Sequence, residues 1–370
     1  MFRFDRRLLL NFDWIMVGAV LAVAFLGMVN LYSASHLYDV VGTSVFVKQL
    51  TFYLLSMAVM LLIVSIDYRV LITWNYLFYT LMILSLVAAL FIGKTIGGSQ
   101  RWIDLGFFRL QPSEPAKLIM VITLASYYYR RESGSGFTLK ELIVPILLTL
   151  VPFALIAKQP DLGTGLMLIF IFATITLFVK LRWSTLMTLV SAGLSAIPIG
   201  WTFFLKPYQR QRIETFLNPE NDPLGTGYHI TQSKIAVGSG HWFGKGFMHG
   251  TQGQLDFLPE RHTDFAFSVW AEEWGFLGSI ILLGCYFFMI LWGLNIAISS
   301  RDKFGVLLAY GITFLIFWQA FINLAMILGL LPVVGIPLPI ISYGGSSLLT
   351  TMAGIGILLN IRMRRYMGTS

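Results

Sequence analysis

The residue best placed to do chemistry in this chain is Asp264. It stands in the stretch TQGQLDFLPERHTDFAFSVWAEEWG, residues 251–275, where a polar segment runs into a long apolar one. A carboxylate beside an apolar span is costly to place, so it needs a partner or a function. A carboxylate sheltered from water has a raised pKa, which suits a general base. We therefore expect Asp264 to act as a base in a transfer reaction.

Two shorter polar segments supply further candidates. In GKTIGGSQRWIDLGFFRLQPSEPAK, residues 93–117, Glu114 and Lys117 lie three positions apart on one helix face. They form either a structural ion pair or part of a polar cavity. Trp102 fits an anchor at a membrane interface as well as a place in that cavity. Asp161, in KQPDLG, either favours the N-terminus of the next helix or joins the same cavity.

The segment 206–263 is the longest polar stretch of the chain, with 58 residues. A connection of this length in a compact protein is usually structured and functional. Its glycines between 238 and 253 allow the backbone to approach a ligand closely. They match neither the dinucleotide-binding fingerprint nor a Walker loop.

The elements that must position these residues are membrane spans. The composition is 56% hydrophobic and only 12% charged, far from that of soluble domains. The single cysteine, Cys285, lies in an apolar run and excludes an intramolecular disulfide. Apolar windows of about 20 residues cross about 30 Å of hydrocarbon. They predict ten spans, at Trp14–Ala34, Val47–Ile66, Leu71–Ile92, Pro115–Tyr129, Leu142–Ala157, Thr164–Val179, Ser184–Leu205, Phe265–Ile298, Gly305–Leu328 and Ile340–Ile361.

The basic residues predict the orientation of these spans. Fourteen basic and six acidic residues fall on the side of the two termini, a surplus of eight that equals the net charge of the whole chain. By the positive-inside rule, that side is cytoplasmic. The excess of basic residues therefore reflects the orientation of the spans in the membrane, and we expect no nucleic-acid partner.

The eighth predicted span is too long to be one straight membrane helix. About 20 residues of hydrocarbon, counted back from Ser299, end near Gly278, which leaves Asp264 about 20 Å further out. We expect the helix to break or tilt near Gly275 and Gly278, or the 206–263 loop to fold over it. Either arrangement shelters Asp264.

Two neighbouring features are expected to be structural. Glu272 and Glu273 lie near the outer interface, where we expect them to make structural hydrogen bonds. The segment 330–347 carries three prolines and three glycines between the last two spans. Broken backbone at membrane depth is tolerated where it lines a cavity, so we expect a rigid cavity wall here.

Several long motifs, in order along nearly the whole chain, resemble the SEDS family of peptidoglycan glycosyltransferases. They are RWIDLG, FRLQPSEPAK, KQPDLGT, YQRQRI, NPENDPLGTGYHITQSKIAVGSG, FLPERHTDF and PLPIISYGGSS. The motifs look more like those of the elongation members, with the division members as the near alternative. The resemblance implies one all-α polytopic domain over residues 1–370 in the bacterial inner membrane, with both termini cytoplasmic. It has ten transmembrane helices and a large structured periplasmic loop, residues 206–263, between helices seven and eight.

The resemblance also implies a function and a set of residues. Such an enzyme polymerises lipid II into glycan strands on the periplasmic face during cell elongation and rod-shape maintenance. It works with a class B penicillin-binding protein transpeptidase and other membrane proteins of the elongation complex. The family's essential aspartate matches Asp264, and further motif positions match Trp102, Gln111, Glu114, Lys117 and Asp161. Two departures are Pro115, where an aliphatic residue is usual, and the pair His241 and Trp242.

Lipid II carries an α-linked sugar pyrophosphate, and polymerisation forms a β-linkage, so the implied step is one inverting displacement. Asp264 would be its base. Arg210 and Arg212 would bind the pyrophosphate through charge-assisted hydrogen bonds, and Lys117 would add a point charge. A divalent cation, Mg or Mn, is compatible with this chemistry, although no compact ligand spacing requires one.

Two other functions fit ten spans and a polar cavity. One is a transporter, or flippase, for lipid II, although the charged and glycine-rich residues gather on one side. The other is a non-catalytic scaffold that activates the penicillin-binding protein.

Overall fold

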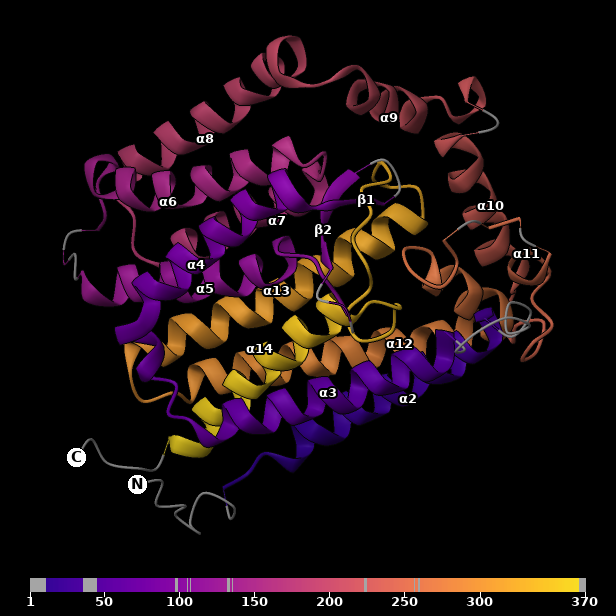
Figure 1. The fold of residues 1–370 in the computed structure, drawn as a ribbon, viewed down its shortest axis with the longest axis horizontal. Helices are drawn as coiled ribbons and strands as arrows, with labels where there is room; N and C mark the ends of the chain where they lie inside the picture. Colours follow the sequence, from indigo (N-terminus) through magenta and orange to yellow (C-terminus); the bar gives the residue numbers. More distant parts are fainter. Residues whose placement is uncertain are drawn as a thin grey trace.

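Ten apolar helices occupy the ten predicted spans (Figure 1). The computed structural model describes residues 11–35, 45–96, 99–104, 106, 108–131, 134, 136–222, 225–255, 257–258 and 260–365. The helices are α2 Trp14–Ser35, α3 Val45–Ser65, α4 Val70–Ile92, α5 Ser113–Arg130, α6 Leu139–Lys158, α7 Leu162–Phe178, α8 Trp183–Ile199, α12 Ala266–Ile298, α13 Lys303–Ile327 and α14 Gly345–Arg364. A π-helical turn, Gly200–Phe204, continues α8.

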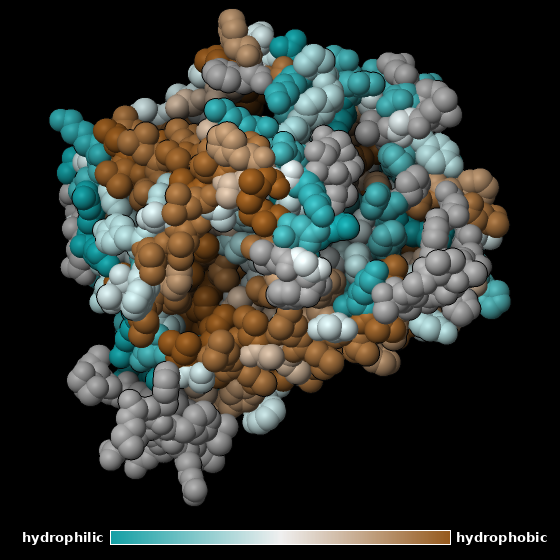
Figure 2. All heavy atoms as spheres, in the orientation of Figure 1, coloured by the Kyte–Doolittle hydropathy of each residue, from teal (hydrophilic) through white to brown (hydrophobic). Residues whose placement is uncertain are grey.

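Eight of these helices are long and apolar enough to cross a membrane by length and composition. Outside that set, α7 has 17 residues, and α5 carries three charged residues, Glu114, Lys117 and Arg130. Apolar side chains cover much of the helical bundle, and polar ones gather at the left edge and toward the upper right (Figure 2). The chain is a multi-pass membrane protein, and its two atypical helices are those that carry or adjoin candidate site residues.

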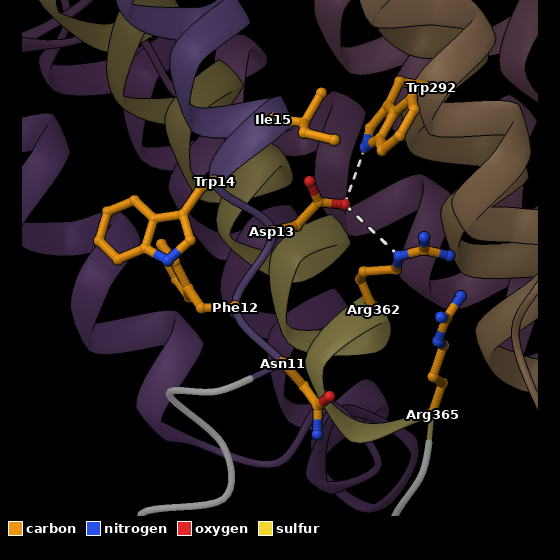
Figure 3. Close-up of a pocket in the computed structure, with 8 residues that line it drawn as sticks. All are labelled: Asn11, Phe12, Asp13, Trp14, Ile15, Trp292, Arg362 and Arg365. Atoms are coloured by element: carbon orange, nitrogen blue, oxygen red, sulfur yellow. Dashed lines mark hydrogen bonds and ion pairs between the residues drawn. The ribbon is translucent and has the colours of Figure 1, made fainter.

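Ion pairs at one end of the bundle connect the ends of distant helices. Asp13 accepts a hydrogen bond from Trp292 Nε1 at 2.8 Å and pairs with Arg362 Nε at 3.5 Å, which joins α2 to α12 and α14 (Figure 3). Arg69 and Asp302 pair at 3.2 Å, which joins the start of α4 to the start of α13. These charges are among those predicted to share the side of the termini.

The opposite end carries a small sheet that the all-α expectation did not include. Its strands are β1 Lys94–Ile96, β2 Ser99–Asp104 and β3 Arg109–Leu110, antiparallel in the order β1-β2-β3. The register places Trp102 opposite Lys94 and Ile103 opposite Leu110. The Gly-Gly pair in the sequence between β1 and β2 is a known hairpin signal.

The 206–263 loop is structured, as predicted. It contains α9 Pro207–Leu217, the 3₁₀ turn Pro219–Asn221, α10 Thr226–Ser239 and the short α11 Thr251–Gln254. In Figure 1 this segment runs from α8 down to the outer end of α12.

Helix α12 is broken at Gly275, whose φ of 62° and ψ of −158° are not helical. A regular helix would pair the amides of residues 276 and 277 with the carbonyls of residues 272 and 273. Loop residues 241–246 take over all four groups, through Phe276 N to His241 O (2.8 Å), Leu277 N to Trp242 O (3.1 Å), Lys245 N to Glu272 O (3.0 Å) and Gly246 N to Glu273 O (3.0 Å). We call this arrangement the splice. Both expected alternatives are therefore confirmed together, since the helix breaks and the loop folds over it.

The splice depends on close backbone contact. A Cβ added at Gly244, which has a φ of 79°, would lie 2.0 Å from the carbonyl oxygen of Glu273. Trp242 packs its ring edge-on against Phe276, with the ring centroids 5.1 Å apart. The unusual residues His241 and Trp242 thus belong to the loop packing.

Candidate active site

Asp264 lies in the turn just before α12, and its main chain is fixed from two sides. Asn323, which is fully buried in α13, donates one Nδ2 hydrogen bond to the carbonyl of Asp264 and another to that of Ile336, both at 2.8 Å. A Cβ added at Gly335, where φ is 70°, would lie 3.4 Å from Asp264 Oδ2. The segment between α13 and α14 therefore lies directly against the candidate base, as expected for a cavity wall.

The same segment is also paired with the turn that precedes Asp264. Ser342 Oγ donates to the carbonyl of Thr263 at 2.6 Å, and the amide of Tyr343 donates to the carbonyl of His262 at 2.8 Å. The expectation that the last span starts at Ile340 is wrong, because the helix starts at Gly345. Ile340 has a φ of 70° and the residues after it bond to the turn, so the helical ladder cannot begin there.

The surroundings of Asp264 raise its pKa to about 6 from an ordinary value of 3.8. Burial is the main cause, and the charge of Glu260 adds to it. The guanidinium of Arg101 opposes the shift, Asp161 adds to it, and Arg212 opposes it. With a pKa of about 6, about nine in ten copies are ionised at pH 7. The carboxylate is therefore ready to accept a proton, and two guanidinium groups lie within electrostatic range of it.

Asp161 gathers donors from three elements around one buried carboxylate. Its oxygens pair with Arg101 Nη1 at 3.4 Å and accept hydrogen bonds from Gln111 Nε2 at 3.1 Å and Ser113 Oγ at 3.4 Å. The side chain also accepts from the amide of Thr164 at 3.3 Å and so caps α7. The helix cap considered for Asp161 is confirmed, and the side chain also joins a polar cluster, while its place in a cavity stays a prediction.

Glu114 and Lys117 form the predicted ion pair inside α5. Lys117 Nζ lies 2.8 Å from Glu114 Oε1, and the two residues are 1% and 3% exposed. Among the described residues, no hydrogen-bond donor reaches Glu114 Oε2. The pair thus keeps a spare acceptor one turn below Gln111 and Ser113, which is compatible with a polar cavity at this depth.

The two arginines of α9 differ in their surroundings. Arg212 donates to the carbonyl of Val333 at 3.1 Å and stands 6.0 Å from the ring centroid of Tyr208. It contributes to the pKa of Asp264 and thus belongs to the site. Arg210 points back toward α8 and donates to the carbonyl of Thr202 at 3.1 Å.

Trp102 is half-buried in β2, next to Arg101. Successive side chains of a strand point to opposite faces, so Trp102 faces away from the side on which Arg101 meets Asp161. The substrate contacts of Trp102 and Arg210 stay predictions.

Three residues of the site were not selected from the sequence. Arg101 lies beside Trp102 and, like it, fits either an interfacial anchor or a place in the cavity, so the sequence alone did not select it. Asn323 is a buried amide in an otherwise apolar helix, a pattern that often marks a specific contact inside a membrane bundle. Glu260 has a φ of 52° and accepts a hydrogen bond from Thr263 Oγ1 at 2.9 Å.

The residues Glu272 and Glu273 serve the splice, as expected. The Glu272 carboxylate accepts hydrogen bonds from Lys245 Nζ at 2.6 Å, Thr251 Oγ1 at 3.0 Å and the amide of Gln252 at 3.0 Å. Glu273 accepts one from Ser33 Oγ of α2. The Glu272 bonds fix the loop onto α12, and the Glu273 bond joins α12 to α2.

Metal ligands do not cluster in the part of the chain that the structure describes: no three His, Cys, Asp or Glu side chains there converge on one point. Asp161 is already occupied by four donors. A cation at this site would therefore draw most of its ligands from a bound substrate.

Comparison with known proteins gives one consistent result. The family model of cell cycle proteins named for FtsW, RodA and SpoVE matches residues 13–367. The peptidoglycan glycosyltransferase MrdB of Escherichia coli K12 is 44% identical over 314 residues, which cover 85% of this chain and 84% of MrdB. The probable peptidoglycan glycosyltransferase FtsW of Trichlorobacter lovleyi is 37% identical and covers 95% of this chain and 93% of its own.

Among solved structures, one chain of a peptidoglycan synthase complex superposes with a TM-score of 0.82 at 33% identity. That complex is described as coordinating polymerization and crosslinking. The match covers 96% of this chain and 99% of the other.

Proposed function

The chain belongs to the FtsW, RodA and SpoVE family, and from this premise we propose that it is an inverting peptidoglycan glycosyltransferase that polymerises lipid II into glycan strands. The observation that carries the proposal is the setting of Asp264. Its carboxylate has a pKa raised to about 6 and lies within electrostatic range of Arg101 and Arg212. A base poised near neutrality beside positive charge is what a displacement of pyrophosphate by a sugar hydroxyl needs.

The reaction follows from these charges. Asp264 accepts the proton of the acceptor's 4-hydroxyl while that oxygen bonds to the anomeric carbon of the donor sugar. The bond from this carbon to the pyrophosphate breaks at the same time, so the α-linkage becomes a β-linkage. Negative charge grows on the departing lipid pyrophosphate, where the fixed guanidinium groups of Arg101 and Arg212 stabilise it. Asp264 then returns its proton to water, which its pKa permits.

A divalent cation, Mg or Mn, is compatible with the same site. It would supply positive charge to the leaving pyrophosphate, and Asp264 is a chain carboxylate that could hold it. Arg101, Gln111 and Ser113 orient Asp161, which in turn holds Arg101 beside the reaction.

The proposal also includes the location of the enzyme in the membrane and its partner proteins. We place the chain in the bacterial inner membrane, with the basic end that holds the termini in the cytoplasm and the site on the periplasmic side. A class B penicillin-binding protein and other elongation-complex membrane proteins are its proposed partners. Support comes from the 33% identical chain, which belongs to a peptidoglycan synthase complex. A solved structure of the Thermus thermophilus rod shape determining protein RodA, 30% identical with a TM-score of 0.71, supports a role in rod shape.

The test is polymerisation of lipid II by the purified chain, alone and with its partner. Wild type should make glycan, and Asp264→Ala should make none while still binding the partner. Asp104→Ala is a matched control, because it removes an exposed carboxylate that pairs with Lys94 at 2.7 Å and accepts a hydrogen bond from the amide of Gly106 at 2.9 Å, away from Asp264. Glycan synthesis by purified Asp264→Ala would refute the assignment. Movement of labelled lipid II across vesicles without glycan would indicate a transporter, and full activity of the complex with Asp264→Ala a scaffold.

A further inference from the structure

A mostly apolar pocket with several polar groups in its lining lies far from Asp264, between α4, α5 and α6. Its volume is about 200 Å³, and its lining includes Asn75, Tyr79, Ser126, Tyr127, Arg130 and Arg131. Arg130 Nη2 donates to the carbonyl of Ile72 at 2.6 Å, so the pocket lies where α4 begins and α5 ends. This is the end of the bundle that holds the termini, because Arg364 of α14 pairs with Asp67 just before α4, at 3.5 Å. The glycosyl-transfer site at the other end does not use any of these residues.

Two buried polar atoms belong to residues that line this pocket and lack a partner among the described residues. Among the described residues, none hydrogen-bonds to Asn75 Oδ1 or Ser126 Oγ, although Asn75 is 5% and Ser126 0% exposed. Such groups are costly to bury at membrane depth, so they indicate a polar occupant. The oxygen and nitrogen of an Asn amide are exchangeable by a flip, so Asn75 can offer a donor or an acceptor. The volume equals that of about six water molecules, enough for a compact polar group.

The charge of the lining specifies the occupant further. Arg130 and Arg131 stand at the mouth, with their guanidinium groups 5.2 Å and 4.9 Å from the ring centroids of Tyr76 and Tyr127. Within the part of the chain that the structure describes, the lining contains no Asp or Glu. Each guanidinium has five N–H donors, and the rings and the Ile72 carbonyl use only part of them. The two arginines therefore offer planar, positively charged hydrogen-bond donors that suit a phosphate.

The order of side chains with depth matches a phospholipid. At 1.5 Å per helical residue, Ser126 lies about 6 Å inward from Arg130, and Tyr79 lies about 13 Å inward from the start of α4. Charged groups thus stand at the helix ends, neutral polar groups one turn deeper, and apolar ones beyond. On α6, Val144 lines this pocket and exposes 41% of its surface. Phosphate, glycerol ester and acyl chain follow one another at the same depths in a bilayer leaflet.

We propose that this pocket binds one anionic phospholipid, with its phosphate on Arg130 and Arg131 and its glycerol ester region on Asn75 and Ser126. Basic pockets between membrane helices on the cytoplasmic side are suited to anionic headgroups. The acyl chains lie along the exposed face of α6. The lipid supplies the partners that the two buried polar atoms lack and holds the three helices together.

The experiment uses the purified full-length chain and measures lipid retention by native mass spectrometry and thermal stability in defined lipid. The probes are phosphatidylglycerol, phosphatidylethanolamine, glycerol phosphate and inorganic phosphate. Phosphatidylglycerol should bind best and raise the melting temperature. Arg130→Gln with Arg131→Gln should weaken its binding about 30-fold, from about 5-fold for each basic residue near the membrane surface.

Two further variants keep the test decisive. Arg131→Gln alone leaves the Arg130 bond to Ile72 intact, so it should fold normally and lose about 5-fold in binding. Lys140→Gln with Lys180→Gln removes the same charge from exposed positions outside the pocket and should leave binding unchanged. An equal loss in this control, equal binding of both phospholipids, or equal binding of inorganic phosphate would each overturn the proposal.

Discussion

Replacement of Asp264 by Asn should slow catalysis strongly and make the protein more stable near neutral pH. The folded state raises the pKa of Asp264 to about 6 from 3.8, so it binds the proton more tightly than the unfolded chain does. The free energy of unfolding therefore falls as the pH rises between these two pKa values. Above about pH 6, the full destabilisation by the ionised carboxylate is present. A pKa difference of about two corresponds to about 3 kcal/mol in the free energy of unfolding, at about 1.4 kcal/mol for each pH unit.

The neutral amide of Asn removes this cost without changing the side-chain volume. At pH 8 the variant should gain up to about 3 kcal/mol, and at pH 4 less than about 1 kcal/mol, since the folded carboxyl is then protonated in wild type as well. Loss of the base should reduce the rate of polymerisation by about 10²- to 10⁴-fold. Paired thermal unfolding at a fixed scan rate and lipid II polymerisation measure the two effects.

The matched control is Asp104→Asn, on the exposed side of β2. A hydrogen bond from Lys94 holds the pKa of Asp104 below its ordinary value, so its replacement should give no stability gain. The reasoning is refuted if Asp264→Asn is less stable than wild type at pH 8, or if it polymerises at the wild-type rate.

Four further outcomes follow from the same contacts. The wild-type rate should fall about tenfold per pH unit below about 6, as Asp264 becomes protonated, and a rate that stays flat to pH 4.5 would contradict this. Asn323→Ala removes the hydrogen bonds to the carbonyls of Asp264 and Ile336, so kcat should fall more than lipid II affinity, as steady-state kinetics would show. Lys117→Met leaves a buried carboxylate unpaired and should cost about 3–5 kcal/mol, whereas adding Glu114→Gln should restore much of the melting temperature. Gly275→Ala forces a side chain into a conformation that only glycine tolerates, at about 1–3 kcal/mol, and should expose the loop of the splice to proteolysis.

The helices were predictable because their signal is local. Runs of apolar residues fix the spans to within a few residues, and the spacing of Glu114 and Lys117 fixes their contact. The excess length of the eighth span also predicted a break near Gly275, since a fixed bilayer thickness limits any straight helix.

The parts that the sequence did not reveal depend on contacts between distant segments. Ile340 lies in an apolar run like that of a helix, yet its neighbours pair with the 262–263 turn, and α14 starts only at Gly345. Arg101 gains its role because Asp161, sixty residues later, lies beside it. Asn323 contacts Asp264 across 59 positions. Periodicity carries no information on such pairings, because they are set by how the helices pack.

The splice at Gly275 also has a mechanical consequence. A straight helix of the 33 residues of α12 would measure about 50 Å, against about 30 Å of hydrocarbon. The break divides it into an inner part that follows the bilayer and an outer part clipped to the loop through backbone bonds. When lipid composition changes the bilayer thickness, the inner part can tilt to compensate. The outer part, anchored to the loop and to Asn323, stays in place, so the reacting carboxylate is insulated from deformations of the membrane in which it works.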